Sequence, residues 1–245
     1  MAYLEIKGLS FSIEGKEILS DISFSLEKGE VTLIAGKNGS GKSFLLKCIK
    51  GLERMQSGTV SLDGRILSKQ KERMKAFALV FQDASLQIVG STVEKDIAFG
   101  LENVGLAEDE VRKRTDEYID FFCLEKTRKL RPQVLSGGEK RKLAIAGALS
   151  MSSDVLLLDE PFANLDYPSV KTVIETIDSL KASGVTVIIV SHEAEKFLFH
   201  TDRTVIIESG RIADQGRSQD MMESLRRHDV YIPSRASFEE LSWLR

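Results

Sequence analysis

The sequence predicts an α/β protein with an N-terminal antiparallel β layer, a mainly parallel core sheet and an inserted helical subdomain. Apolar and polar residues alternate through most of residues 4–26, which is typical of half-buried antiparallel strands. A continuous apolar strand at 31–35 leads through a glycine-rich loop into a segment with helical spacing. Two further apolar strands, at 155–158 and 185–190, flank a helical segment at about 170–180. This βαβ pattern indicates a parallel sheet.

The chain has 245 residues, enough for one domain with a subdomain. Residues from about 93 to 149 are mostly compatible with helix, and their charge-rich runs leave Val111, Tyr118 and Phe122 to face inward. We therefore expect them to form the inserted subdomain. Within one domain, 1–245, the expected parts are the β layer and core at about 1–82 and 150–216, a loop and the helical subdomain at about 83–149, and a tail at 217–245.

Composition excludes several classes of protein. The 34 Lys and Arg nearly cancel the 37 Asp and Glu, which argues against a protein that coats the nucleic-acid backbone. No apolar run approaches the roughly 18 to 20 residues that a membrane-spanning helix needs. The N-terminal segment places Glu5 beside Lys7 and lacks the apolar stretch of a secretory signal. We expect a cytoplasmic protein that does not cross a bilayer by itself.

Two smaller features favour structural roles. Cys48 and Cys123 have apolar neighbours and no CxxC arrangement, so we expect buried free thiols. A basic cluster precedes the strand expected at 77–81. Its members are Lys69, Lys71, Arg73 and Lys75. Because Glu72 interrupts the cluster and no aromatic residue is interleaved, we interpret it as a solvated face.

Residues 36–43 fit the phosphate-loop pattern G-x-x-x-x-G-K-[ST]. They are Gly36, Lys37, Asn38, Gly39, Ser40, Gly41, Lys42 and Ser43. The glycines let successive backbone N–H groups point at phosphate oxygens, Lys42 neutralises phosphate charge and the Ser43 hydroxyl can hold Mg²⁺. Since the motif lies between an apolar strand and a helix, as this mechanism requires, the sequence predicts phosphate binding.

An apolar strand ends in two carboxylates, Asp159 and Glu160, followed by Pro161. Ligands collect at the carboxyl ends of strands in open α/β sheets, and adjacent side chains point apart. One carboxylate can therefore meet Mg²⁺ while the next faces the water that attacks the γ-phosphate. A polar turn before the proline is the alternative reading, and the phosphate loop makes it the weaker one.

Ser136 and Glu139 form a capping-box pattern before a helix. Capping alone accounts for these two residues, but not for the adjacent Gly137 and Gly138. The glycines would let an anion approach the exposed N–H groups at the helix start. We therefore predict a second phosphate contact there.

In nearly its whole length the chain resembles the nucleotide-binding subunit of an ATP-binding cassette (ABC) transporter. The motifs that carry the resemblance are, in order, the phosphate loop, LSGGE at 135–139, LLLDEP at 156–161, Asn164-Leu165-Asp166 and Ser191-His192. The resemblance implies a P-loop NTPase with a RecA-like core that uses ATP and Mg²⁺. It also implies a head-to-tail dimer in which Ser136 and Gly138 of one subunit close over the ATP held by Lys42 of the other.

The same resemblance assigns further roles. Gln82, after the strand expected at 77–81, matches the Q-loop glutamine, which touches Mg²⁺ and the attacking water and reports to the membrane partner. Asp159 matches the Mg²⁺-associated aspartate and Glu160 the general base. His192 matches the switch histidine at the γ-phosphate, and Asp166 the D-loop aspartate at the subunit interface.

Two positions depart from the family pattern. Ile13 stands where an aromatic residue commonly stacks on adenine, and Phe44 stands where a hydroxyl residue follows the phosphate-loop serine. We expect both to contact the nucleotide, Phe44 through its backbone N–H, with weaker contacts than the usual residues give.

A narrower resemblance covers 81–100 and 140–147, which are similar to energy-coupling factor (ECF) ATPases that power uptake of vitamins and metal ions. It implies a second ABC ATPase subunit, identical or paralogous, an integral-membrane transport subunit and a place at the cytoplasmic face of the membrane. Another subunit selects the solute in such systems. A conventional ABC importer ATPase, an iron–sulfur assembly ATPase and a nucleic-acid ATPase are the alternatives. The short interval between Ser43 and Ser136 leaves no room for the long coiled coil of many DNA-repair ATPases, and no nucleic-acid partner is expected.

Overall fold

The computed structural model describes residues 2–151 and 153–244. An antiparallel sheet, in the order β2-β1-β4-β5, forms the N-terminal layer, as expected. Its strands are β1 (Leu4–Ile13), β2 (Lys16–Leu26), β4 (Ser57–Leu62) and β5 (Arg65–Ile66). Leu4 pairs with Leu26 and Ile6 with Phe24, so the alternating apolar residues share one buried face.

A six-stranded sheet, in the order β10-β9-β3-β8-β7-β6, forms the core. Its strands are β3 (Val31–Ala35), β6 (Phe77–Val80), β7 (Val155–Asp159), β8 (Thr186–Val190), β9 (Arg203–Glu208) and β10 (Arg211–Arg217). Five strands are parallel and β10 is antiparallel to β9. The parallel strands β3, β6, β7 and β8 are buried throughout, which explains their continuous apolar sequence.

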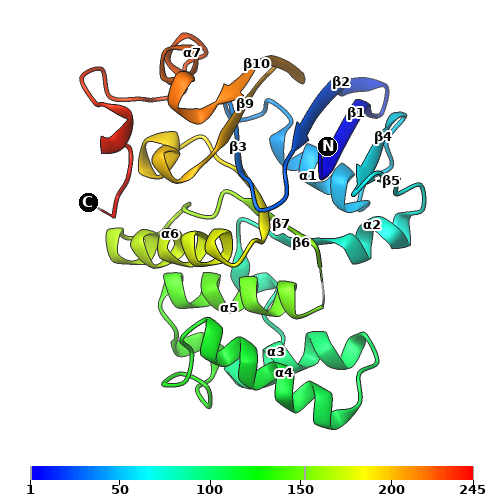
Figure 1. Ribbon diagram of the computed structural model, residues 1–245, viewed down its shortest axis with the longest axis vertical. Helices are drawn as coiled ribbons and strands as arrows, with labels where there is room; N and C mark the ends of the chain where they lie inside the picture. The colour runs from blue at the N-terminus through cyan, green and yellow to red at the C-terminus, as the bar shows by residue number, and fades with distance from the viewer. Residues whose placement is uncertain (1, 152, 245) are drawn as a thin grey trace.

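The helices lie mainly below this sheet in Figure 1, with α5 and α6 next to it and α3 and α4 farther away. The α-helices are α1 (Lys42–Lys50), α2 (Gln70–Ala76), α3 (Val93–Asn103), α4 (Glu108–Phe121), α5 (Gly137–Ser150), α6 (Tyr167–Ala182) and α7 (Met222–Arg227). Short 3₁₀ turns occupy Ala84–Leu86, Pro132–Val134, Ala194–Lys196, Leu198–His200, Ser218–Asp220 and Phe238–Glu240.

Two hydrophobic clusters cover the two faces of the core sheet. Leu33 packs with α5 and α6, whereas its neighbour Ile34 packs with α1 and the antiparallel layer. The first cluster also contains Val230 and Ile232, so part of the C-terminal tail is built into the core. This packing fixes α1 between the two sheets. The loop that connects β3 to α1 is therefore closely surrounded by neighbouring strands.

Three local expectations are corrected. Cys123 is exposed because it occupies a turn with φ +50° after α4, although Cys48 is buried and both thiols are free. Arg73 is buried and donates to the Cys48 carbonyl oxygen at 2.9 Å, so it does not belong to the solvated face. Helix α6 begins at Tyr167, before the expected start, because Asp166 caps it. Val111 and Phe122 are buried as expected, and Tyr118 is half-buried.

Candidate nucleotide site

The phosphate loop connects β3 to α1, and two glycines allow it to lie against neighbouring strands. Gly36 has φ +147°, and a Cβ there would lie 2.2 Å from the Ile207 carbonyl oxygen. Gly41 has φ +101°, and a Cβ there would meet the Leu19 side chain at 2.8 Å. Side chains at these positions would force the loop away from β9 and β2.

Lys42 turns back onto its own loop. Its Nζ donates to the carbonyl oxygens of Gly36 at 2.7 Å and Lys37 at 3.0 Å. Burial lowers the pKa of Lys42, and the negative charges of Glu160 and Asp159 oppose that shift. The loop therefore contains a buried ammonium group close to backbone groups that can hold an anion. Among the described residues, the buried Ser40 hydroxyl has no hydrogen-bond partner.

Asp159 joins the end of β7 to the start of α1. Its Oδ1 accepts a hydrogen bond from the Ser43 hydroxyl at 2.9 Å. Burial raises the pKa of Asp159, the Ser43 hydrogen bond lowers it and the nearby Glu160 raises it further. The Ser43 oxygen on α1 and the Asp159 oxygen on β7 therefore meet at the carboxyl edge of the parallel sheet.

Glu160 faces the end of β8 instead. Its Oε1 lies 2.9 Å from His192 Nδ1, and its Oε2 accepts from the Ser191 hydroxyl at 3.1 Å. The backbone of Glu160 has φ +44°, an unusual conformation for a residue with a side chain. The two adjacent carboxylates therefore contact different partners. Asp159 contacts Ser43 on α1, and Glu160 contacts His192 just after β8.

Gln82 lies exposed in the loop between β6 and α3, which we call the Q-loop. Among the described residues, no hydrogen bond joins its side chain to Ser43 or Asp159. It lines a cavity of about 400 Å³ together with the start of α5 and Asn164. The structure therefore places Gln82 beside the LSGGE segment of its own chain.

Ser136 caps α5 through the expected reciprocal contacts with Glu139, at 3.2 Å and 2.8 Å. The adjacent glycines have a packing explanation that the sequence did not reveal. A Cβ on Gly137 would meet the Leu165 side chain at 2.7 Å, and one on Gly138 would lie 2.9 Å from Ser169 Cα. The glycine pair is therefore not by itself a sign of an anion site, because close packing of α5 against the start of α6 already requires it; the second phosphate contact stays a prediction.

Ile13 lies at the end of the β1–β2 hairpin with 38% of its surface exposed. The same hairpin supplies Leu19, which contacts Gly41 of the phosphate loop. The Phe44 ring stacks on Phe11 with a 5.4 Å centroid separation, so it points into the core. Only the backbone of Phe44 is placed to act at the loop.

Asp166 has a role within its own chain, because its side chain accepts from the Ser169 N–H at 3.1 Å and caps α6.

Two further polar residues at the Q-loop were not predicted from the sequence. Arg141 donates to the loop backbone, and Gln87 closes the base of the loop. Arg141 has the helical spacing of the apolar face that contains Ala144 and Ile145, and this position could have predicted that Arg141 is buried.

A glycine-rich loop between a buried strand and a helix, with a lysine inside it and two carboxylates on a neighbouring strand end, defines a P-loop nucleotide-binding protein. The family model described as ABC transporter matches residues 19–163, more than half of the chain. The chain belongs to the ABC transporter family, and it has the ATPase fold of that family.

Individual relatives agree with this membership. The chain is 39% identical over 230 residues to the energy-coupling factor transporter ATP-binding protein EcfA1 of Thermotoga maritima, covering 94% of this chain and 87% of that protein. It is 33% identical over 249 residues to the EcfA protein of Methanocaldococcus jannaschii, covering 98% and 89%. CbiO1 of Clostridium perfringens, described as part of the ABC transporter complex CbiONQ, superposes with a TM-score of 0.84 at 31% identity, covering 95% and 96%.

Proposed function

We propose that the chain is the ATP-binding and ATP-hydrolysing subunit of an ECF-type membrane importer of a vitamin or metal ion. The observation that carries ATP hydrolysis is that the buried Lys42 lies close enough to Asp159 and Glu160, at one edge of the parallel sheet, for their charges to act on it. The relatives named energy-coupling factor transporter ATP-binding proteins support the transporter class. No helix in the described part of the chain is long and apolar enough to cross a membrane. We place the protein peripherally at the cytoplasmic face, attached to a separate membrane subunit.

In this proposal the backbone N–H groups of 36–44 bind the phosphates of ATP, and Lys42 exchanges its loop carbonyl partners for phosphate oxygens. Glu160 accepts a proton from the attacking water as general base. His192 contacts the γ-phosphate and, through Nδ1, keeps the Glu160 carboxylate oriented. Ile13 covers the adenine ring.

The donor set fits Mg²⁺. Ser43 Oγ and Asp159 Oδ1 are hard oxygen ligands, and Gln82 can add an amide oxygen. Among the described residues, no group of three or more His, Cys, Asp or Glu side chains is arranged to hold a metal ion by itself. When bound, Mg²⁺ would neutralise charge on the phosphate oxygens.

The proposed active form is an ATP sandwich of two subunits, the second being the same chain or a paralogue. Ser136 and Gly138 of one subunit contact the ATP held by Lys42 of the other. The start of α5 supports this, because Ser136 and Gly137 are exposed and the N–H groups of the first helical turn can donate to an anion, although Gly138 itself is buried against Ser169.

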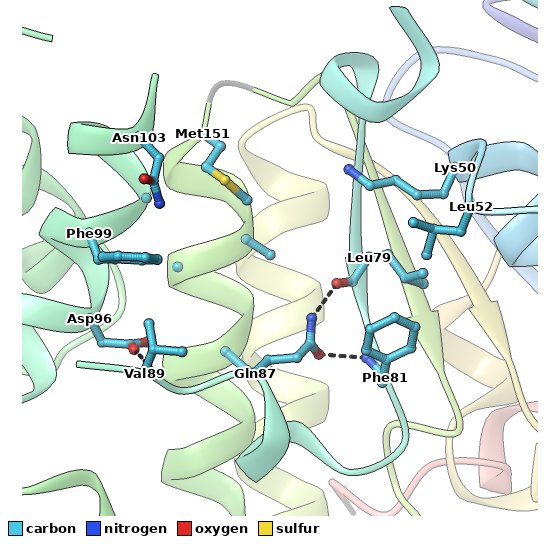
Figure 2. Close-up of a pocket in the computed structure, with 14 residues that line it drawn as sticks. Lys50, Leu52, Leu79, Phe81, Gln87, Val89, Asp96, Phe99, Asn103 and Met151 are labelled. Carbon is cyan, nitrogen blue, oxygen red and sulfur yellow. Dashed lines mark hydrogen bonds between the residues drawn. The ribbon is translucent and has the colours of Figure 1, made fainter. Parts of the chain in front are cut away.

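The membrane subunit is proposed to dock in the groove between α1, β6 and the helical subdomain, which has a volume of about 280 Å³. Figure 2 shows Leu52 on one side and Phe99 on the other, with Gln87 of the Q-loop between them. Leu52, Val89 and Phe99 keep 41%, 62% and 47% of their surfaces exposed. An apolar cytoplasmic segment of a membrane protein fits this lining, and it would touch the Q-loop directly.

The test is copurification from detergent-solubilised membranes, with captured chains identified by mass spectrometry. Wild type is expected to retain a polytopic membrane protein, and Phe99→Asp is expected to lose it while still binding ATP. Phe121→Asp is the matched control, because Phe121 is a similarly exposed aromatic residue (44%) outside the groove. Recovery of only a soluble scaffold or ribosomes, or equal retention by the two variants, would contradict the docking proposal.

A further inference from the structure

Arg141 lies on α5 with only 3% of its surface exposed. Its Nη1 donates to the Phe81 carbonyl oxygen at 2.7 Å, and its Nη2 donates to the Gln82 carbonyl oxygen at 2.8 Å. One rigid guanidinium therefore holds two successive peptide groups, including that of the Q-loop glutamine. Because the fork is planar, it restricts the direction of the loop as well as its distance from α5.

Burial of the Arg141 cation has a free-energy cost. Burial lowers the pKa of Arg141, and the charges of Asp83 and Asp159 oppose that shift. No carboxylate in the described part of the chain forms an ion pair with it, and its buried Nε has no hydrogen-bond partner. A buried cation without an ion pair costs free energy that an apolar side chain of similar size would not. Packing alone therefore does not account for an arginine at this position.

A second side chain fixes the base of the same loop. Gln87 Oε1 accepts from the Phe81 N–H at 2.7 Å, and its Nε2 donates to the Leu79 carbonyl oxygen at 2.8 Å, as Figure 2 shows. Gln87 thereby occupies hydrogen-bonding positions at the free edge of β6. Because Gln87 holds the start of the loop at Leu79 and Phe81, the direction of the Gln82 backbone depends on its contact with Arg141.

Arg141 also belongs to α5, the helix that Ser136 caps, and Gln82, Gly137 and Arg141 line one cavity. We infer that Arg141 is a positioning residue that sets the direction of Gln82 according to the position of α5. This inference rests on the proposed function, in which the start of α5 contacts the nucleotide of the partner subunit. It follows that nucleotide contact at one site orients the glutamine of the other site.

The test is a double-mutant cycle on the full chain, with ATP affinity, turnover and Mg²⁺ dependence measured for each variant. Arg141→Ala is expected to keep ATP affinity within about threefold, to lower turnover at least about tenfold and to raise the half-saturating Mg²⁺ concentration. Adding Arg141→Ala to Gln82→Ala is expected to cause no further loss, because a residue that acts through Gln82 cannot act without it. Lys142→Ala is the control, since it removes a positive charge from the neighbouring position of α5.

Arg141→Lys separates positioning from folding. Lysine keeps the charge but not the two-pronged geometry, so it is expected to recover stability fully and turnover only in part. If Arg141→Ala does not fold, Arg141→Lys takes its place in the cycle. Additive losses in the double variant, or a Lys142→Ala defect as large as that of Arg141→Ala, would overturn the inference.

The same measurements separate this inference from the proposed function. Impaired turnover in Gln82→Ala with normal turnover in Arg141→Ala overturns the positioning role alone. Normal turnover and Mg²⁺ dependence in Gln82→Ala overturn the proposed role of Gln82, and the inference fails with it.

Discussion

Glu160 and His192 are joined by a 2.9 Å contact between Oε1 and Nδ1, and Ser191 holds the other oxygen of the same carboxylate. The contact arises because β7 and β8 are adjacent parallel strands whose carboxyl ends meet at one edge of the sheet. This contact uses Nδ1 as a donor to Glu160 Oε1, so Nε2 is the ring nitrogen left for a phosphate oxygen, to which it donates only when it also carries a hydrogen. The ring and the carboxylate therefore orient each other before any substrate chemistry begins.

Replacing Glu160 with glutamine is expected to keep ATP binding and to reduce turnover by roughly 10²- to 10⁴-fold, because the amide preserves the shape but cannot accept the proton. Hydrolysis would then be the slow step, so gel filtration of the variant should reveal a dimer that forms only with ATP. Glu193→Gln is the control, since Glu193 pairs with Lys196. Near-normal steady-state hydrolysis in Glu160→Gln would remove Glu160 from the role of general base.

Asp96 gives a prediction about stability and pH. Burial raises its pKa, and the N–H groups of Gly90 and Val89 oppose that shift by donating to Oδ1 at 2.7 Å each. A carboxyl group with a raised folded-state pKa binds its proton more tightly in the folded chain. Folding stability is therefore lost as pH rises from the unfolded-state pKa through the folded-state value, and the loss persists at pH 7.

Asp96→Asn keeps an oxygen that can accept both N–H groups and removes the buried charge. We expect it to raise the free energy of unfolding at pH 7 by about 1 kcal/mol, roughly 2 to 4 °C in melting temperature, and to flatten the pH dependence above pH 4. Urea titrations from pH 4 to 8 measure both effects, with the exposed Asp120→Asn as control. A less stable Asp96→Asn at pH 7 would mean that the charge-assisted hydrogen bonds outweigh the cost of burial.

The main elements were predictable because their signals are local. The buried parallel strands appear in the sequence as short apolar runs, and the phosphate loop at 36–43 is marked by its own glycines. Asp159 contacts Ser43 on α1, and Glu160, which follows the end of β7 with φ +44°, contacts residues just after β8; their different directions agree with the expectation that adjacent side chains point apart. These features need no knowledge of distant contacts.

The features that were missed depend on tertiary contacts. Arg141 lies on the apolar side of α5 by its spacing, but its charge assigns it to solvent unless its partners, here two loop carbonyl groups, are known. The need for Gly138 comes from Ser169, which belongs to a different helix. Cys123 has apolar neighbours but a left-handed backbone, so its side chain leaves the core that Phe122 and Leu124 enter.

Sharing of each active site between two subunits predicts recovery of activity on mixing. Lys42→Ala disables the phosphate loop and Ser136→Arg blocks the opposing helix start, so each variant alone is expected to be inactive. A mixed dimer places both lesions in one composite site and leaves the other intact. Mixed dimers are isolated through two different affinity tags, and their turnover is compared with that of each parent.

Activity near half of wild type in the mixed dimers supports the sandwich if one intact site turns over independently. Mixed dimers that stay as inactive as their parents would count against sharing. If the partner is a paralogous ATPase, the two lesions are placed on the two different chains in both combinations, and the same comparison applies.

Ile13 leads to a prediction about base selectivity. Its aliphatic side chain presents no aromatic face to adenine, whereas base stacking on an aromatic residue contributes about 1 to 3 kcal/mol. Dispersion still favours coverage of the ring, and the phosphate loop supplies most of the charge-assisted contacts. We expect wild type to prefer ATP over GTP only modestly.

Ile13→Tyr is expected to tighten ATP binding by up to about tenfold, since 1.4 kcal/mol corresponds to one decade in affinity. Phe11 and Tyr3 are the nearest aromatic residues in sequence that could stack on the base instead, but Phe11 is buried against Phe44 and Tyr3 lies at the other end of β1. Calorimetric titration of both nucleotides with Mg²⁺, in the Glu160→Gln background to prevent turnover, measures the effect. Strong discrimination by the parent protein, unchanged in Ile13→Tyr, would show that a residue outside β1 stacks on the base and that Ile13 does not cover it.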